Sequence, residues 1–560
     1  MHERKHPKVE ERVREYVRRG WWGETTLSDL LEQAVAAHPD RMALVDQPNR
    51  ESLDGDTPKR WTWAELSDEV ETGARALARL GVGRGDAVVV QLPNVADFVV
   101  LYLALARLGA VISPVPVQYS RHELRMIAEA IEPALFVGIT RFHDHDLTQA
   151  AKSVGFRQCV WLGPEPPDGD APFSSLLDQA RSETDTPPVN SNANDIMTVC
   201  WTSGTTGSPK GVPRTHNQWM AIAPATYEGA EMREGDVLLN PFPFVNMASI
   251  GGFLINWLRC QGTLVLHHPL ELPVFLSQIP QEGVTFTIAP PALLNMLLKN
   301  DELMSQFDLS NLRCIASGSA PLSPWMVKGF ADKYDIGVVN LFGSNEGVSL
   351  VSGLEDMPDP TLRASYFPRF GVDGIEWNAS VSKVVSTRLR DLETGDIITE
   401  KGQPGMLEIK GATIFDHYLG DTPDNPDVFT DDGYFRTGDL FEISGDGSPP
   451  PFYHFVGRSK DIIIRGGNNI SPDELDTMLA AHPALAEAAT VGYPDDDLGE
   501  RVCAFVVPKP GEQVSLDDIT GFLREQGLAV FKLPERLETI DALPRNALGK
   551  VVRDELRQQL

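Results

Sequence analysis

The stretch AVVVQLPNVADFVVLYLALARLGAVISPV, residues 87–115, places two apolar runs on either side of a helical segment. The runs cover residues 87–92 and 110–115, and the helical segment covers 95–108. Both runs are apolar at consecutive positions, which is typical of strands buried on both faces. The pattern therefore predicts parallel strands with helices on both sides of the sheet.

The same alternation continues on either side of this stretch. Thr62-Trp63-Ala64-Glu65 has the form of a capping box, and the apolar residues after it recur at helical spacing. A helix from Arg121 and an apolar run over 134–139 follow. Residues 161–195 are rich in Pro, Asp, Ser and Asn and lack periodicity, so we expect a long surface connection there.

Further along, strand and helix signals alternate to about residue 350, and short glycine-punctuated runs then predict a β-rich section. Beyond Gly457, Ser471-Pro472-Asp473-Glu474 combines a capping box with Pro at the first helical position. We predict an α/β fold. A large N-terminal domain, residues 1–457, holds parallel, helix-covered sheets and the β-rich section, and residues 458–560 form a small α+β lid domain.

The composition narrows the class of protein. The chain has 560 residues, more than one hydrophobic core usually organises, so we expect at least two domains. Its 79 acidic and 49 basic residues give a net charge of −30. That charge argues against nucleic acid or an anionic membrane as the main partner, because both would repel the chain. An anionic substrate would need local positive charge at its site.

The cysteines and the longest apolar segments indicate the cellular compartment of the protein. The five cysteines are far apart and form no Cys-x-x-Cys pair, which favours a reducing environment. The first sixteen residues are charged throughout, and the apolar stretch 98–106 stops at Arg107. We therefore expect neither a signal peptide nor a membrane span, and predict a cytoplasmic protein.

A loop rich in glycine and hydroxyl groups, Thr-Ser-Gly-Thr-Thr-Gly-Ser-Pro-Lys-Gly at 202–211, follows the apolar run 196–201. Such a loop presents backbone N–H groups and hydroxyls to phosphate oxygens, and its lysine adds charge. The spacing differs from a Walker A loop. A solvated linker is the alternative interpretation. The predicted phosphate-binding residues are Thr202, Ser203, Gly204, Thr205, Thr206, Gly207 and Lys210.

At this loop the sequence resembles the adenylate-forming superfamily of AMP-binding enzymes, which includes acyl- and aryl-CoA synthetases, peptide-synthetase adenylation domains and beetle luciferases. The resemblance extends through nearly the whole chain. Its other motifs occur in family order: Gly318-Ser319-Ala320-Pro321, Phe342 to Glu346, Tyr434 to Leu440, Gly457 to Asp461 with Gly466-Gly467, and Pro544 to Lys550.

The resemblance implies a two-step reaction that uses ATP, Mg²⁺ and CoA. A carboxylate attacks the ATP α-phosphate, pyrophosphate leaves, and a thiol or amine then attacks the acyl adenylate. Since the reactants are anions, catalysis is chiefly alignment and charge neutralisation. Lys550, Glu346 and Lys210 would be the catalytic residues: Glu346 would hold Mg²⁺, and Lys550 would bridge the carboxylate and the α-phosphate.

The family motifs also assign nucleotide and acceptor contacts. Asp439 would accept both ribose hydroxyls, Phe342 would stack on adenine, and Arg458 would contact ribose or phosphate. Taken singly, each has a plain structural interpretation, such as a turn aspartate or a core phenylalanine. The remaining implied residues are Gly318, Ser319, Ala320, Gly343 and Asn345 for the nucleotide, Lys460 for a hinge, and Gly466 and Gly467 for passage of pantetheine.

The chain departs from the family pattern at two places. Asn345 stands where many relatives carry Thr before the magnesium glutamate. No histidine lies between His216 and His267, so Phe244, Val245 or Asn246 must replace the aromatic gate of relatives. The acid pocket implied by the resemblance comprises Phe244, Val245, Asn246, Met247, Ile250, Gly318 and Gly343, and its apolar members suggest an apolar acid. Taken singly, each apolar member has the alternative interpretation of a plain core residue.

The chain looks most like stand-alone aryl-acid-activating members, with which it shares Pro213 to His216. We predict an AMP-forming acid–thiol ligase that converts a small aryl, alicyclic or medium acyl acid to its CoA thioester. The alternative is an AMP ligase that hands the acyl group to a carrier protein or an amine in trans. A third possibility, a catalytically silent nucleotide-binding protein, is disfavoured by Glu346, Asp439 and Lys550.

Overall fold

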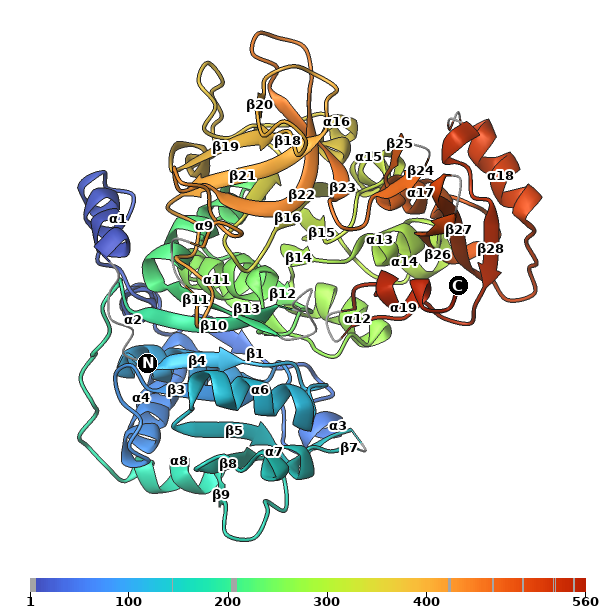
Figure 1. Ribbon diagram of the computed structural model, residues 1–560. Helices are drawn as coiled ribbons and strands as arrows, with labels where there is room; N and C mark the ends of the chain where they lie inside the picture. The colour runs from blue at the N-terminus through green and yellow to red at the C-terminus, as the bar shows by residue number, and fades with distance from the viewer. Residues whose placement is uncertain are drawn as a thin grey trace.

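The computed structural model shows several sheets in one chain (Figure 1). The residues that it describes are 7–143, 145–202, 209–421, 425–465, 468–495, 498–526, 528, 530–546 and 549–560.

The first sheet contains the stretch 87–115. Its strands, in spatial order, are β11 (Lys210–Thr215), β10 (Ile196–Thr202), β4 (Val111–Pro114), β3 (Ala87–Gln91), β5 (Leu135–Ile139), β8 (Cys159–Leu162) and β9 (Ala171–Pro172). The pairs are parallel except β10 with β11. Val88 and Val90 pack with α4 (Trp63–Arg79) and α5 (Ala96–Leu108), whereas Val89 packs with α6 (Arg121–Ile131) and α7 (Thr148–Val154). Helices therefore cover both faces, as predicted.

The second sheet joins the N-terminal region to residues 237–352. Its spatial order is β17 (Ser349–Ser352), β16 (Gly337–Gly343), β15 (Cys314–Gly318), β14 (Phe286–Ile288), β12 (Val237–Asn240), β13 (Thr263–Leu266), β1 (Met42–Val45) and β2 (Arg60–Thr62). Only the two edge pairs, β16–β17 and β1–β2, are antiparallel. One face packs with α2 (Leu27–Ala37), α9 (His216–Gly229) and α11 (Ile255–Cys260), and the other with α12 (Leu272–Glu282), α13 (Pro291–Leu298) and α15 (Pro324–Tyr334).

The predicted β-rich section is an antiparallel sheet, drawn mainly in yellow and orange in Figure 1. Its order is β18 (Tyr366–Pro368), β23 (Phe452–Arg458), β22 (Phe435–Ser444), β21 (Gly405–Gly411), β19 (Val385–Arg390) and β20 (Ile397–Ile398). A further sheet follows β23 in the chain, made of β24 (Ile463–Arg465), β25 (Asn468–Ile470), β26 (Leu485–Asp495), β27 (Gly499–Pro508) and β28 (Arg536–Thr539). Helices α17 (Pro472–Leu479), α18 (Leu516–Glu525) and α19 (Arg553–Arg557) accompany it.

The predicted helix starts are confirmed, and one predicted connection is wrong. The Thr62 side chain accepts from the Glu65 N–H at the start of α4, and Ser471 accepts from the Glu474 N–H at the start of α17. The segment 161–195 is not a plain connection, because it contains β9 and helix α8 (Phe173–Arg181). The helix buries Phe173, Leu177 and Ala180 along one face. Its short length, with polar residues on both sides, hid this periodicity.

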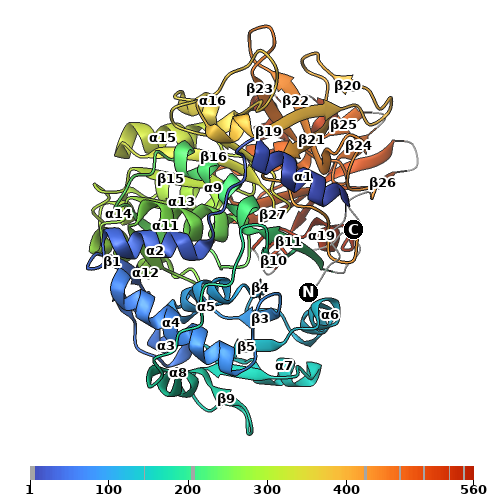
Figure 2. The ribbon, with the colours of Figure 1, turned by 90° about the vertical axis from the view of Figure 1, so that its left-hand side faces the viewer.

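The N-terminal helix α1 (Pro7–Arg18) is drawn in dark blue in Figure 2, and its Tyr16 and Val13 belong to a small apolar cluster with Ala412, just after β21, and Val384, just before β19. It is followed by Trp22, whose buried indole donates to the Ala412 carbonyl at 3.0 Å. Arg12 forms an ion pair with Asp416. The segment from α1 to Trp22 thus packs on the turn after β21, which contacts the candidate site.

Candidate active site

The strands that flank the predicted phosphate loop are paired. Thr202 ends β10 and stands opposite Lys210, the first residue of β11. The prediction for Ser203, Gly204, Thr205, Thr206 and Gly207 falls outside the described residues. The Lys210 side chain is exposed, and its Nζ lies 4.9 Å from the centroid of the Tyr418 ring. Both ends of the loop are therefore held at one sheet edge.

Glu346 lies in the turn between β16 and β17, with only 8% of the residue exposed. Its backbone carbonyl accepts from Phe415 N at 2.8 Å, and its Oε1 accepts from the Tyr418 hydroxyl at 2.9 Å. In the described part of the chain, no hydrogen bond reaches Oε2. Gly347 has a φ of +103°, and a Cβ there would lie 1.9 Å from the Thr413 carbonyl oxygen. Only glycine fits this turn.

A buried arginine supports the same turn. Arg214, on β11, donates to the carbonyl oxygens of Asn345 at 3.1 Å and Thr413 at 3.0 Å, and its guanidinium stacks over Trp219. Burial lowers the pKa of Arg214 to about 10, so the group remains charged at neutral pH. Arg214 belongs to the shared motif Pro213 to His216, but nothing in that motif assigns it this role.

Asp439 and Arg458 face each other across two strands. Asp439 on β22 is in register with Arg458 at the end of β23, and Arg458 Nε lies 3.5 Å from Asp439 Oδ1. The Asp439 side chain is 16% exposed. Burial raises the pKa of Asp439 to about 6, although the positive charges of Arg458 and Lys550 oppose the increase.

Lys550 belongs to a hairpin in which Arg545 pairs with Val551 and Lys550 N donates to Asn546 Oδ1 at 3.0 Å. The residue is exposed, but nearby protein atoms take the place of part of the water around its ammonium, and this loss of hydration lowers the pKa of Lys550. The charge of Arg458 lowers that pKa further, while Asp439 and Glu346 raise it. The structure thus brings four predicted site residues from separate chain segments within electrostatic range.

The residues predicted to bind the nucleotide, with Phe342 stacking on adenine, lie on or just after two neighbouring strands. Gly318 ends β15 and is in register with Leu341 on β16, and a Cβ at Gly318 would lie 2.2 Å from the Leu341 carbonyl oxygen. Ser319, which precedes Ala320, has a φ of +71°. Phe342 is half-buried, with aromatic neighbours at centroid distances of 5.0 to 5.9 Å; they are Phe441, Phe455 and Phe367. Gly343 ends β16.

The predicted acid-pocket segment runs beside the Glu346 turn. Phe244 is fully buried, with its ring against Phe98, and Val245 and Ile250 are also buried. The Asn246 side chain accepts from Ser249 N at 3.3 Å. Met247 N donates to Asn345 Oδ1 at 2.9 Å, a contact that sequence reasoning did not foresee. Asn345 therefore joins this segment to the turn that carries Glu346.

The predicted hinge Lys460 is exposed in a turn after β23. Its neighbour Ser459 donates from both N and Oγ to the Gly438 carbonyl, each at 3.0 Å. Gly466 and Gly467 lie outside the described residues. The roles given to these three residues remain predictions.

The donor set suits Mg²⁺ held mainly by a nucleotide. Mg²⁺ prefers one or two carboxylates together with phosphate oxygens and water. Glu346 supplies one buried carboxylate with an oxygen left open. Across the described ranges, no group of three or more His, Cys, Asp or Glu side chains could hold a metal ion.

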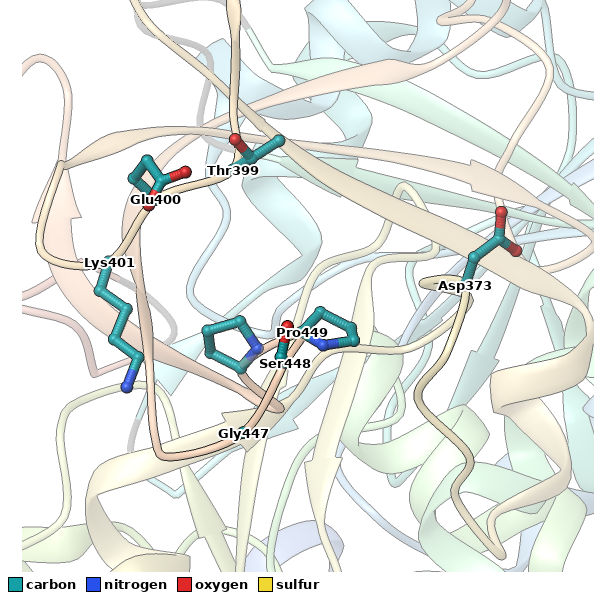
Figure 3. A pocket seen from close by; sticks show the side chains of 8 residues that line it. Asp373, Thr399, Glu400, Lys401, Gly447, Ser448 and Pro449 are labelled. Atoms are coloured by element: carbon teal, nitrogen blue, oxygen red, sulfur yellow. The ribbon is translucent and has the colours of Figure 1, made fainter.

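A hollow of about 710 Å³ lies elsewhere, in the β-rich section (Figure 3). It is lined on one side by Thr399, Glu400 and Lys401 and on the other by the turn from Gly447 to Pro450. None of the predicted site residues lines it. In the described regions, no helix has both the length and the apolar character needed to span a membrane.

Comparison with known proteins identifies the family. The model of the AMP-binding enzyme family matches residues 31–419, and that of the AMP-binding enzyme C-terminal domain matches 474–550. The first match covers more than half of the chain. The chain therefore belongs to the AMP-binding enzyme family, as its motifs predicted.

Relatives in this family differ in the activities that their names give. The chain is 28% identical to the 2,3-dihydroxybenzoate-AMP ligase of Bacillus subtilis, covering 99% of this chain and 97% of the relative. It is 29% identical to the long-chain fatty-acid CoA ligase FadD13 of Mycobacterium tuberculosis, and the match covers 95% of this chain and 97% of that ligase. The ATP-bound crystal structure of MatB from Rhodopseudomonas palustris matches with a TM-score of 0.78 and 26% identity, covering 96% of this chain and 99% of MatB. The chain is an adenylate-forming ligase by these relationships.

Proposed function

We propose that the protein activates a small carboxylic acid with ATP and transfers the acyl group to CoA. The observation that carries this proposal is that Glu346, Asp439, Arg458 and Lys550 interact electrostatically, while Tyr418 contacts both Glu346 and Lys210 at one end of the predicted phosphate loop. In an acidic chain, Arg458, Lys550 and Lys210 supply the local positive charge that two anionic reactants require.

Each side chain has a proposed task. Asp439 accepts hydrogen bonds from the ribose hydroxyls, which are donors that an ionised carboxylate can hold. Lys210 neutralises phosphate charge, and Lys550 draws the acid carboxylate toward the α-phosphate. Mg²⁺ at Glu346 would neutralise charge on the leaving pyrophosphate.

The acid is proposed from the residues of the predicted pocket, and the acceptor from the charge of the chain. Buried Val245 and Ile250 favour an apolar aryl or alicyclic acid, and the resemblance to aryl-acid ligases supports the same class. The net charge of −30 repels both CoA and an acidic carrier protein, which is the alternative acceptor. We favour CoA because local arginines can meet its few phosphates, whereas an acidic carrier would face the acidic protein over a wider surface. We also propose that residues 458–560 form a mobile lid on the body 1–457, with Lys460 as its hinge.

The test is mass spectrometry of products from aryl, alicyclic and fatty acids incubated with ATP and Mg²⁺, with and without CoA. We expect acyl adenylate without CoA, and acyl-CoA with AMP when CoA is present. Adenylate that accumulates in the presence of CoA, and is discharged only by a carrier protein, would favour the alternative. No acid-dependent AMP with any acid would refute the proposal for this panel.

A further inference from the structure

Tyr418 contacts two oppositely charged residues, Lys210 at the end of the predicted phosphate loop and Glu346 in the turn after β16. Its hydroxyl donates to Glu346 Oε1 at 2.9 Å, and its ring lies under the Lys210 ammonium at 4.9 Å. Neither contact follows from sequence spacing, because the three residues lie in segments far apart along the chain.

The backbone and packing fix the position of Tyr418. The next residue, Leu419, donates its N–H to the Gly211 carbonyl at 2.9 Å, which ties the turn to β11. A Cβ at Gly211 would lie 2.5 Å from Leu419 Cδ1, so the turn packs closely on this strand. The Tyr418 ring also packs edge-on against Phe415 at 4.8 Å.

The direction of the hydrogen bond is set by chemistry. An ionised carboxylate only accepts hydrogen bonds, so the phenol must donate. In this contact Tyr418 is the donor and Glu346 Oε1 the acceptor, so the second carboxylate oxygen is left for another partner.

The arrangement keeps Lys210 and Glu346 apart. Within the described residues, Lys210 forms no ion pair within 4.0 Å with any carboxylate. An aromatic ring attracts a cation without neutralising it. The Lys210 charge thus remains available to a phosphate, and Glu346 Oε2 remains available to a cation.

We propose that Tyr418 is a positioning residue that orients the Glu346 carboxylate for a divalent cation and holds Lys210 ready for phosphate. The hydroxyl performs the first task and the ring face the second. This inference rests on the cation role of Glu346 in the proposed function. A group that orients a metal ligand typically changes metal affinity by about 10–100-fold when it is removed.

The test separates the two tasks with Tyr418→Phe and Tyr418→Leu. Titration calorimetry measures ATP affinity at a series of free Mg²⁺ concentrations and in EDTA, and electron paramagnetic resonance measures Mn²⁺ bound to the enzyme–ATP complex. We expect Tyr418→Phe to weaken metal binding about 10-fold or more, with ATP affinity in EDTA unchanged. Tyr418→Leu should also weaken ATP binding in EDTA, because Lys210 loses the ring.

Tyr227→Phe is the matched control. Tyr227 is also a partly buried tyrosine beneath a cation, Arg259 at 5.3 Å, but it lies on α9 away from Glu346. We expect its metal and ATP affinities to stay within twofold of those of the parent protein. Thermal melts check that each variant is folded.

A double-variant cycle decides whether Tyr418 acts through Glu346. In the Glu346→Ala background, Tyr418→Phe should cause no further loss of metal affinity. Additive losses, an unchanged affinity in Tyr418→Phe alone, or an equal loss in EDTA would overturn the positioning role. If Glu346→Ala itself leaves metal binding unchanged, the cation role in the proposed function fails instead.

Discussion

Replacing Asp439 with Asn should stabilise the nucleotide-free protein at pH 8 while weakening its binding of ATP. The carboxyl group has a pKa of about 6 in the folded protein and an ordinary value of 3.8. Ionising a group with that difference costs the folded state about 3 kcal/mol. Asparagine has nearly the same volume as aspartate and cannot ionise.

The sign of the effect follows from proton linkage. Below pH 3.8 the carboxyl group is protonated in both the folded and unfolded states, so its ionisation costs nothing. As pH rises from 3.8 to 6, the unfolded chain ionises first and stability is lost. The stability advantage of the Asp439→Asn variant over the parent protein should be about 1.5 kcal/mol at pH 5 and about 3 kcal/mol at pH 8.

Urea unfolding of the nucleotide-free protein at both pH values is the assay, because about 3 kcal/mol shifts the melting temperature of so long a chain by only about 2–3 °C. Asp178→Asn, at a side chain 79% exposed, is the control and should change stability by less than about 0.5 kcal/mol. Calorimetry should show ATP binding weakened about tenfold or more in Asp439→Asn. A variant less stable than the parent at pH 8, or equally stabilised at both pH values, would refute the reasoning.

Three other substitutions test the fold and the site. Arg50→Met leaves buried Asp46 and Asp54 without their cation, whereas Asp97 keeps Lys59, so the variant should lose about 3–5 kcal/mol in urea unfolding. Arg181→Met, at an arginine whose side chain is 48% exposed, should lose less than about 1 kcal/mol, and similar losses in the two variants would contradict the burial argument. Gly347→Ala should reduce metal-dependent ATP binding at least about tenfold, because the new Cβ displaces the turn; an unchanged titration would show that the turn adapts. Lys550→Ala should abolish acid-dependent exchange of pyrophosphate into ATP but spare thioester formation from supplied acyl adenylate; equal loss of both would remove its assigned role.

Local features were predictable from sequence. The strand and helix limits within 87–115 agree with β3, α5 and β4 to within one or two residues, since the signals for them lie inside the segment. The caps at Thr62 and Ser471 were predictable for the same reason. Ordered motifs then identified the family without any knowledge of strand order.

Contacts between distant segments were not predictable. Arg214 supports the Glu346 turn from a strand more than a hundred residues earlier, and Tyr418 contacts Glu346 across 72 residues. No spacing rule links such positions, because sheet topology alone brings them together. A lone tyrosine after a predicted strand carries no signal of its role.

The place of β1 in the second sheet determines when that sheet can form during translation. Val45 pairs with Val265, which is translated 220 residues later, and the parallel neighbours β12 and β14 are also downstream. Until they arrive, the β1–β2 pair has an apolar edge without a partner. Since domains fold as units during translation, the β1–β2 pair stays without its sheet neighbours while other parts of the N-terminal body can already fold. We expect that interval to be when the nascent protein most needs chaperone protection.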